Sequence, residues 1–241
     1  MLAQLVRYWR AFARDTWNAR PIGFDSNDPH FAARAGSCIA TFPLNSTYAT
    51  ERLVTSLDSL NQRRSVPSRQ LGEPGPNATQ LNQLLHAAIR VPDHGKLVPW
   101  RLLAIRGDAR ARLGKQLAEL HLRKEPDSAP AVLDKDRDRF NVAPLIVAVI
   151  ARIEANHPKI PEQEQLLSAG CVAYNLLLGA QALGFGAQWL TGWAAYDRDA
   201  ANLLGLSQNE RSIGFVHIGH TTEAAPERHR PALADVFSEW H

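Results

Sequence analysis

A run of small and apolar residues, Ala169–Ala182, constrains the fold of this chain more than any other segment. It lies in the longest helix that the sequence predicts, residues 162–183, and Gly184 follows as the expected C′ residue. Because the run is small and apolar on nearly every side of the helix, no wide polar face is left for solvent. The pattern predicts a central buried helix.

The other predicted elements mix short strands with helices. Strands are expected at residues 101–106, 145–153, 186–191 and 212–218, and helices at residues 50–62, 77–89, 108–123 and from residue 197. Thr50, Asn77 and Asp108 are the expected N-caps of the first three helices. The charged stretch 124–139 is interpreted as a linker and residues 228–241 as a polar tail. Because these elements lack regular βαβ spacing, the sequence indicates an α+β fold.

The chain divides near residue 50 into an N-terminal extension, 1–50, and a main domain, 51–241. A length of 241 residues with 45% hydrophobic content supports one substantial core with an appendage. Residues 15–49 contain scattered prolines and no sustained period, whereas residues 1–14 place Leu2, Leu5, Val6, Trp9 and Ala13 on one helical face. That face fits a transit peptide or a membrane-surface helix. It also fits an extra helix packed on the domain or an upstream start codon, and we favour these two.

Composition excludes several classes of protein. The net charge is only +3, and no basic block is interleaved with aromatic residues, so nucleic acid is not an expected partner. Cys38 and Cys171 are the only cysteines, too few for a disulfide framework, and a reducing cytoplasm fits best. The longest apolar run, residues 144–151, is far shorter than the roughly 20 residues of a membrane helix.

Arg63-Arg64-Ser65 is the first candidate binding motif. Two guanidinium groups and a hydroxyl at the end of a helix suit a phosphate, which takes bidentate charge-assisted hydrogen bonds. The ordinary alternative is that both arginines are solvated, or that they complement the helix dipole.

The loop Pro92–Trp100 is the second candidate. Two prolines stiffen it on either side of His94, at the entrance to a predicted strand, where a side chain is well placed to face a ligand. His94 is otherwise a surface or core residue, Lys96 either accompanies a flavin or faces solvent, and Trp100 fits the core better than cofactor stacking.

Leu190-Thr191-Gly192, at the end of a predicted strand, is the third candidate. Gly192 permits a close approach of the backbone to a planar ring, although the segment also fits an ordinary turn. Gly184-Phe185-Gly186 follows a helix instead of opening one, so it is not a dinucleotide-binding fingerprint. His217 and His220 have no third ligand nearby, and no metal site is expected.

Five segments in order along residues 55–241 together resemble the nitroreductase superfamily, in particular its compact YdjA-like branch. They are Arg63-Arg64-Ser65, the Pro92–Trp100 loop, residues 168–171, residues 184–189 and residues 214–219. The resemblance implies an FMN-binding α+β homodimer, with a small, mostly antiparallel sheet flanked by helices around a long central helix. It also implies that the flavin lies at the subunit interface. The first 50 residues match nothing in this family.

The resemblance also implies roles for single residues. Arg63, Arg64 and Ser65 match the segment that holds the flavin phosphate and ribityl chain, and a C-terminal arginine, Arg228 or Arg230, completes the phosphate site. Leu190, Thr191 and Gly192 match the turn along the isoalloxazine. His94 matches a flavin-contacting histidine, and Val98 occupies a position that is often Gln, reaching the flavin of the other subunit. Either Ser68 or Arg69 faces the pyrimidine edge, where Arg69 or Lys96 stabilises the reduced flavin.

The resemblance therefore implies a cytoplasmic, FMN-dependent NAD(P)H oxidoreductase. Hydride passes from NAD(P)H through the flavin to a nitroaromatic, quinone or other small-molecule acceptor in a ping-pong cycle, and the flavin does the chemistry without a catalytic side chain. The alternative is a flavin-binding protein with little turnover, which acts as a store, carrier or sensor.

Overall fold

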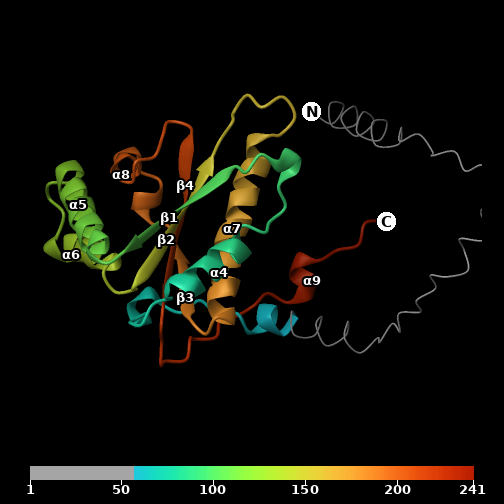
Figure 1. The fold of residues 1–241 in the computed structure, drawn as a ribbon, viewed down its shortest axis with the longest axis horizontal. Helices are drawn as coiled ribbons and strands as arrows, with labels where there is room; N and C mark the ends of the chain where they lie inside the picture. The colour runs from blue at the N-terminus through green and yellow to red at the C-terminus, as the bar shows by residue number, and fades with distance from the viewer. Residues whose placement is uncertain (1–56) are drawn as a thin grey trace, which may run out of the picture. The chain divides into compact units, whose positions relative to one another are not determined.

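The computed structural model describes residues 57–241 (Figure 1). The predicted extension 1–50, with its apolar helical face, and the expected N-cap Thr50 lie outside the described residues. Residues 57–62 are helical, as the predicted end near Gln62 requires. No helix in the described part of the chain is long and apolar enough to cross a membrane.

Four strands form the sheet in the order β1-β2-β4-β3, and every neighbouring pair is antiparallel. The strands are β1 (Trp100–Arg106), β2 (Leu145–Arg152), β3 (Gly186–Leu190) and β4 (Glu210–Gly219). The register pairs Leu145 with Ile218 across β2 and β4, and Gln188 with His217 across β3 and β4. Each predicted strand is present, so the α+β prediction is confirmed.

Helices α4 (Ala78–Ala88) and α7 (Glu162–Ala182) pack against one face of this sheet (Figure 1). Asn77 caps α4 in a capping box with Gln80, as the sequence predicted. The core on this face contains alternate residues of β2, among them Val147 and Val149, and buried residues of α7, among them Val172 and Leu176.

The opposite face of the sheet packs on a second core, which includes Ile146, Ala148 and Phe215. It is covered mainly by α5 (Asp108–Lys124), which packs on α6 (Pro130–Arg139), and by α8 (Arg198–Leu203), which Asp197 caps. The two helices α5 and α6 lie together at one side of the domain in Figure 1. Because both faces are covered, β2 is buried from Leu145 to Ala151.

Two predictions about this layer were wrong. The stretch 124–139 is not only a linker, because its second half forms α6, with Pro130 in the first turn. The N-cap of α5 is Gly107 instead of Asp108, which already lies in the first turn. The charges of α6 hid the helix, because its inward-facing Asp136 is buried by polar contacts that a hydrophobic pattern does not register.

The end of α7 is as predicted. Gly184 has a φ of 82°, and the amides of Gly184 and Phe185 donate to the carbonyls of Gln181 and Ala180, which makes a Schellman motif.

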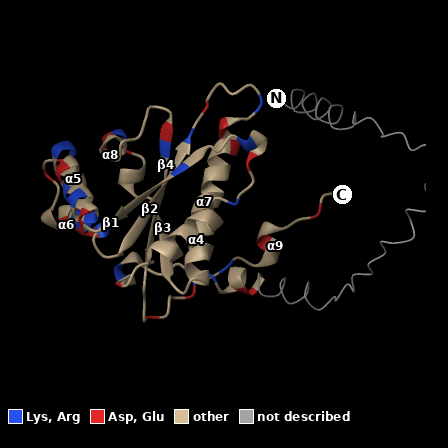
Figure 2. Ribbon diagram, viewed as in Figure 1, with Lys and Arg blue, Asp and Glu red and all other residues tan. Residues whose placement is uncertain are grey.

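The prediction that α7 is buried on nearly every side is wrong for the described chain, because Leu167, Cys171 and Tyr174 are exposed along one stripe. Charged residues occur only in its first turn, whereas α5 and α6 carry many (Figure 2).

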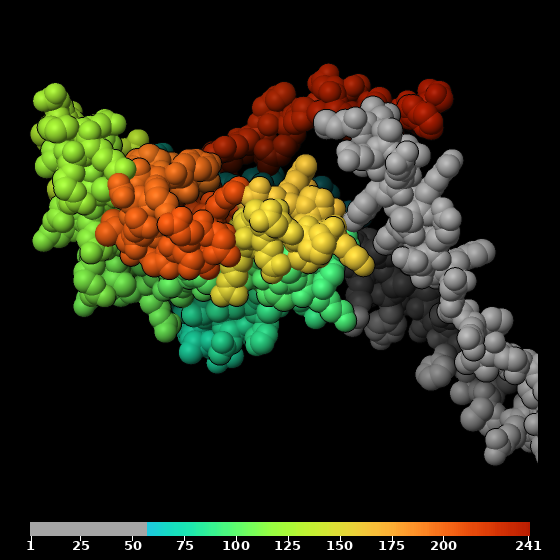
Figure 3. Space-filling view, turned by 90° about the horizontal axis from the view of Figure 1, so that it is seen from above, coloured from blue at the N-terminus to red at the C-terminus, as the bar shows by residue number. Residues whose placement is uncertain are grey.

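The C-terminal segment leaves the body of the domain as an arm (Figure 3). It contains the short helix α9 (Leu233–Val236), which the sequence did not predict. Leu233, Phe237 and Trp240 are all exposed, and Trp240 is 99% accessible. The arm therefore presents apolar side chains without a partner in the described chain.

Candidate functional site

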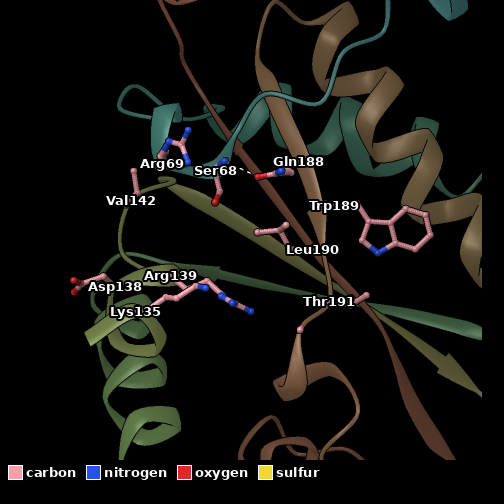
Figure 4. Close-up of a pocket in the computed structure, with 11 residues that line it drawn as sticks. Ser68, Arg69, Lys135, Asp138, Arg139, Val142, Gln188, Trp189, Leu190 and Thr191 are labelled. Atoms are coloured by element: carbon pink, nitrogen blue, oxygen red, sulfur yellow. Dashed lines mark hydrogen bonds between the residues drawn. The ribbon is translucent and has the colours of Figure 1, made fainter. Parts of the chain in front are cut away.

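A cavity of about 580 Å³ opens where three segments meet (Figure 4). These are the 3-10 turn η1 (Ser68–Gln70), the C-terminal end of β3 with the turn that follows it, and one face of α6. Its lining residues are Ser68, Arg69, Lys135, Asp138, Arg139, Val142, Gln188, Trp189, Leu190, Thr191 and Gly192. The cavity therefore joins parts of the chain that are more than a hundred residues apart.

The segment 63–70 is fixed beside β3 by hydrogen bonds. The amide of Val66 donates to the carbonyl of Ala187 at 3.0 Å, and the amide of Ser68 donates to Oε1 of Gln188 at 2.6 Å. Both Ser68 and Arg69 line the cavity. Which of the two faces the pyrimidine edge of a flavin stays a prediction.

The predicted phosphate residues 63–65 form the start of this segment, and their side chains make two sets of contacts. Nη1 of Arg63 donates to Oγ of Ser65 at 3.2 Å. Arg64 forms an ion pair with Glu227, and Nη2 of Arg230 lies 3.6 Å from Oε1 of the same carboxylate. Of the two C-terminal candidates, Arg230 contributes its side chain, whereas Arg228 takes part through its backbone.

Leu190, Thr191 and Gly192 line the other side of the cavity. Gly192 has φ 68° and ψ −176°, a backbone region that is essentially limited to glycine. A Cβ atom built there would lie 2.1 Å from Nη1 of Arg139, so the guanidinium and this backbone are in close contact. The turn thus brings α6 against the end of β3.

His94, Lys96 and Val98 do not line the cavity. Nδ1 of His94 lies 2.7 Å from Oε2 of Glu164, in the first turn of α7. The carboxylate of Asp93 accepts the amides of Leu97 and Val98 and holds the loop in shape. Val98 is 49% exposed at a φ of 52°, which is unusual for a β-branched residue. Within one chain, therefore, Ser68, Arg69 and Leu190–Gly192 line the cavity, whereas the loop that carries His94 does not.

Comparison with known proteins gives the family. The model of the nitroreductase family matches residues 60–220. The chain belongs to this family. YdjA of Escherichia coli K12, which carries the name of an NAD(P)H nitroreductase, is 34% identical over 164 residues, or 68% of this chain and 87% of YdjA. A Haemophilus influenzae protein named for the same activity is 35% identical over 170 residues, 70% of this chain and 90% of its own length. The predicted resemblance is confirmed.

Solved nitroreductases share the fold. A structure from Desulfovibrio desulfuricans, determined in complex with FMN, superposes with a TM-score of 0.60 at 24% identity. The superposition covers 77% of this chain and 96% of the other.

Six residues that line the cavity received no site role from the sequence: Lys135, Asp138, Arg139, Val142, Gln188 and Trp189. The first three lie on α6, whereas the sequence predicted a linker there. The spacing of four between Lys135 and Arg139 was the available signal, because residues four apart share one face of a helix. Gln188 and Trp189 belong to the family segment 184–189, but neither had a role of its own.

His217 lies on β4 opposite Gln188 and is completely buried. Neither ring nitrogen has a hydrogen-bond partner. Burial, together with the nearby charge of Arg139, lowers the pKa of His217 to about 4, so the ring is neutral at neutral pH. Among residues 57–241, no group of three His, Cys, Asp or Glu side chains is arranged to hold a metal ion.

Proposed function

We propose that this nitroreductase binds FMN in the cavity between η1 and the β3 turn and uses it as an NAD(P)H-dependent oxidoreductase. The observation that carries the proposal is the meeting of Ser68 and Arg69 with Leu190–Gly192 around one cavity. Two segments that the sequence assigned independently to one flavin are thus adjacent in space. FMN in a related structure and the NAD(P)H nitroreductase names of two relatives point to the same chemistry.

The donors present fit the phosphate of FMN. Arg63, Arg64, Ser65 and Arg230 offer guanidinium and hydroxyl donors, and among residues 57–241 the acidic partner of Arg64 and Arg230 is Glu227. A dianionic phosphate competes with Glu227 for the two arginines, because both groups accept bidentate charge-assisted bonds. Glu227 then acts as the counterion that keeps Arg64 and Arg230 positioned before the flavin binds.

The turn and η1 fit the ring system. Gly192 has no side chain, so backbone amides of the turn are accessible from the cavity. Arg69 places a cation in the cavity, where it would stabilise negative charge on the pyrimidine edge. A bound FMN would supply the hydride chemistry between NAD(P)H and a nitroaromatic, quinone or other acceptor, so the protein would need no side-chain nucleophile.

His94 and Val98 belong, in this proposal, to the site of a second subunit. The loop that carries them is next to the first turn of α7, and α7 leaves Leu167 62% exposed and Tyr174 and Cys171 uncovered. An uncharged helical stripe of this kind is what a homodimer buries. A second copy packed on this stripe would bring its His94 loop toward the flavin of the first copy. Val98 would then stand where relatives often have a Gln that contacts this flavin.

Leu167→Glu tests the dimer. We expect this variant to be monomeric by analytical ultracentrifugation and to lose FMN, because a buried unpaired charge opposes association. Leu122→Glu on α5, where Leu122 is also partly exposed, is the matched control and should remain dimeric. A Leu167→Glu protein that stays dimeric and retains its flavin would exclude this stripe as the interface.

Turnover separates an enzyme from a flavin store, carrier or sensor. The proposal predicts steady-state oxidation of NADH or NADPH by the FMN-loaded protein when 4-nitrobenzamide or menadione is added. Tight FMN binding without acceptor-dependent oxidation of either nucleotide would favour the non-enzymatic alternative.

A further inference from the structure

Three cations line the cavity without a partner in the described chain. Among residues 57–241, the side chains of Arg69, Lys135 and Arg139 have no hydrogen-bond or ion-pair partner, and Asp138 is the one carboxylate that lines the cavity. Other partly buried arginines of the domain are paired: Arg101 binds Glu210, and Arg110 donates to the carbonyl of Ala143. The cavity therefore carries an excess of positive charge that the protein itself does not neutralise.

The cations of α6 point into the same space. Lys135 and Arg139 are four residues apart, so they share a face of the helix. Figure 4 shows both side chains extending from α6 toward the turn after β3, with the carboxylate of Asp138 on the other side. The guanidinium of Arg139 lies against the backbone of Gly192 at the cavity wall, and the residue is partly buried, whereas Lys135 is exposed. An anionic group in the cavity would accept charge-assisted hydrogen bonds from this guanidinium.

The phosphate of FMN is not the natural partner of these cations. Arg63, Arg64, Ser65 and Arg230 form a separate donor cluster, and none of them lines the cavity. With the flavin phosphate assigned to that cluster, Lys135 and Arg139 are left for a second anion. That anion belongs to whatever occupies the cavity beside the flavin.

We propose that Arg139, assisted by Lys135, binds an anionic oxygen group on the second ligand of the cavity. This inference rests on the proposed function. The group is either a carboxylate or similar anion on the electron acceptor, or the diphosphate of the nicotinamide dinucleotide, which share the chemistry that a guanidinium recognises bidentately. In the first case, acidic aromatic acceptors would be preferred to neutral ones; in the second, the contact would favour the dinucleotide and leave acceptor preference unchanged.

The test compares 4-nitrobenzoate with 4-nitrobenzamide, which differ in charge but little in shape. Their dissociation constants are measured by calorimetry on the oxidised FMN-loaded protein, and kcat/KM is measured for both acceptors. Arg139→Gln should lower the preference for nitrobenzoate over nitrobenzamide by about tenfold, both in the ratio of dissociation constants and in the ratio of kcat/KM values. This is the loss expected for one charge-assisted contact at a partly exposed site. The control is Arg137→Gln, since Arg137 lies on the same helix but pairs with Asp134 outside this cavity, and it should leave both ratios near the wild-type values.

A parallel titration with NADP⁺ distinguishes the two sources of the anion. Weaker nitrobenzoate binding in Arg139→Gln identifies the acceptor, and weaker NADP⁺ binding alone identifies the dinucleotide. The inference is overturned if neither ligand is affected. It is also overturned if nitrobenzamide loses as much affinity as nitrobenzoate, or if the variant loses affinity for FMN but not for riboflavin. Failure of the wild-type protein to bind FMN would instead overturn the proposed function, a result obtained before any variant is made.

Discussion

Replacing Gly192 with alanine tests the geometry of the turn that faces the cavity. The backbone there has φ 68° and ψ −176°, a conformation that residues other than glycine rarely adopt. A Cβ would also lie 2.1 Å from Nη1 of Arg139, and its other close neighbours belong to the same side chain. Because the tip of an arginine can swing away, most of the energetic cost comes from the backbone.

We expect Gly192→Ala to lower the free energy of unfolding by about 2 kcal/mol, within the range for a residue forced into a sparsely populated conformation. For a domain of this size, that loss lowers Tm by roughly 4–8 °C. Displacement of Arg139 and the new methyl group at the cavity should also weaken FMN binding. Urea unfolding of the protein without flavin and fluorescence titration with FMN measure the two effects separately.

The control is Gly205→Ala. Gly205 also has a φ of 68°, but nothing lies within 4 Å of a Cβ built there, and it does not line the cavity. It should cost about 1 kcal/mol through the backbone alone and leave FMN affinity intact. If Gly192→Ala unfolds at the wild-type urea concentration and binds FMN normally, our description of the turn is wrong.

Two further changes probe the loop and the α5–α6 layer. Val98→Asn should raise the free energy of unfolding by about 1 kcal/mol, because Asn tolerates the left-handed conformation that Val98 adopts at φ 52°. An unchanged or lower stability in urea would argue against backbone strain at this residue. The hydrogen bond that the ring of His121 donates to the carboxylate of Asp136 raises the pKa of His121 above its usual 6.5, although burial opposes this. The charge of Asp136 and the contact with Glu125 add to the rise. The stability that the protonated ring contributes is therefore fully present below pH 6.5 and is lost as the pH rises through the higher pKa of the folded protein. The urea midpoint of the wild type should fall between pH 6 and pH 8. That of His121→Gln should change less.

Elements with local signals were predictable from the sequence. Asn77 with Gln80 marks the start of α4, and Gly184 marks the end of α7, since both act through hydrogen bonds to near neighbours in the chain. The apolar run 144–151 predicts β2 in the same way. In contrast, α6 is stabilised by long-range contacts: Asp136 accepts from Trp193 and lies 2.6 Å from His121. No local pattern contains those partners.

The candidate site follows the same division. Ser65–Arg69 and Leu190–Gly192 could be proposed from their motifs, and the hydrogen bond from Ser68 to Gln188 explains why they lie on one cavity. Arg139 was harder to propose: its spacing from Lys135 signals a shared helical face only once α6 is known to be a helix, and its contact with Gly192 is long-range. His94 lies beside Glu164 and away from the cavity, and we propose that it and Val98 act in the site of a second subunit.

The visible spectrum of the purified full-length protein shows whether the cavity holds a flavin that exchanges electrons with NAD(P)H. We expect the absorbance of bound flavin, or its appearance after incubation with FMN and gel filtration. We also expect bleaching when NADH or NADPH is added without oxygen, and recovery of the colour with an acceptor. A protein that stays colourless after incubation with FMN, or whose flavin neither nucleotide reduces, would contradict the proposed function.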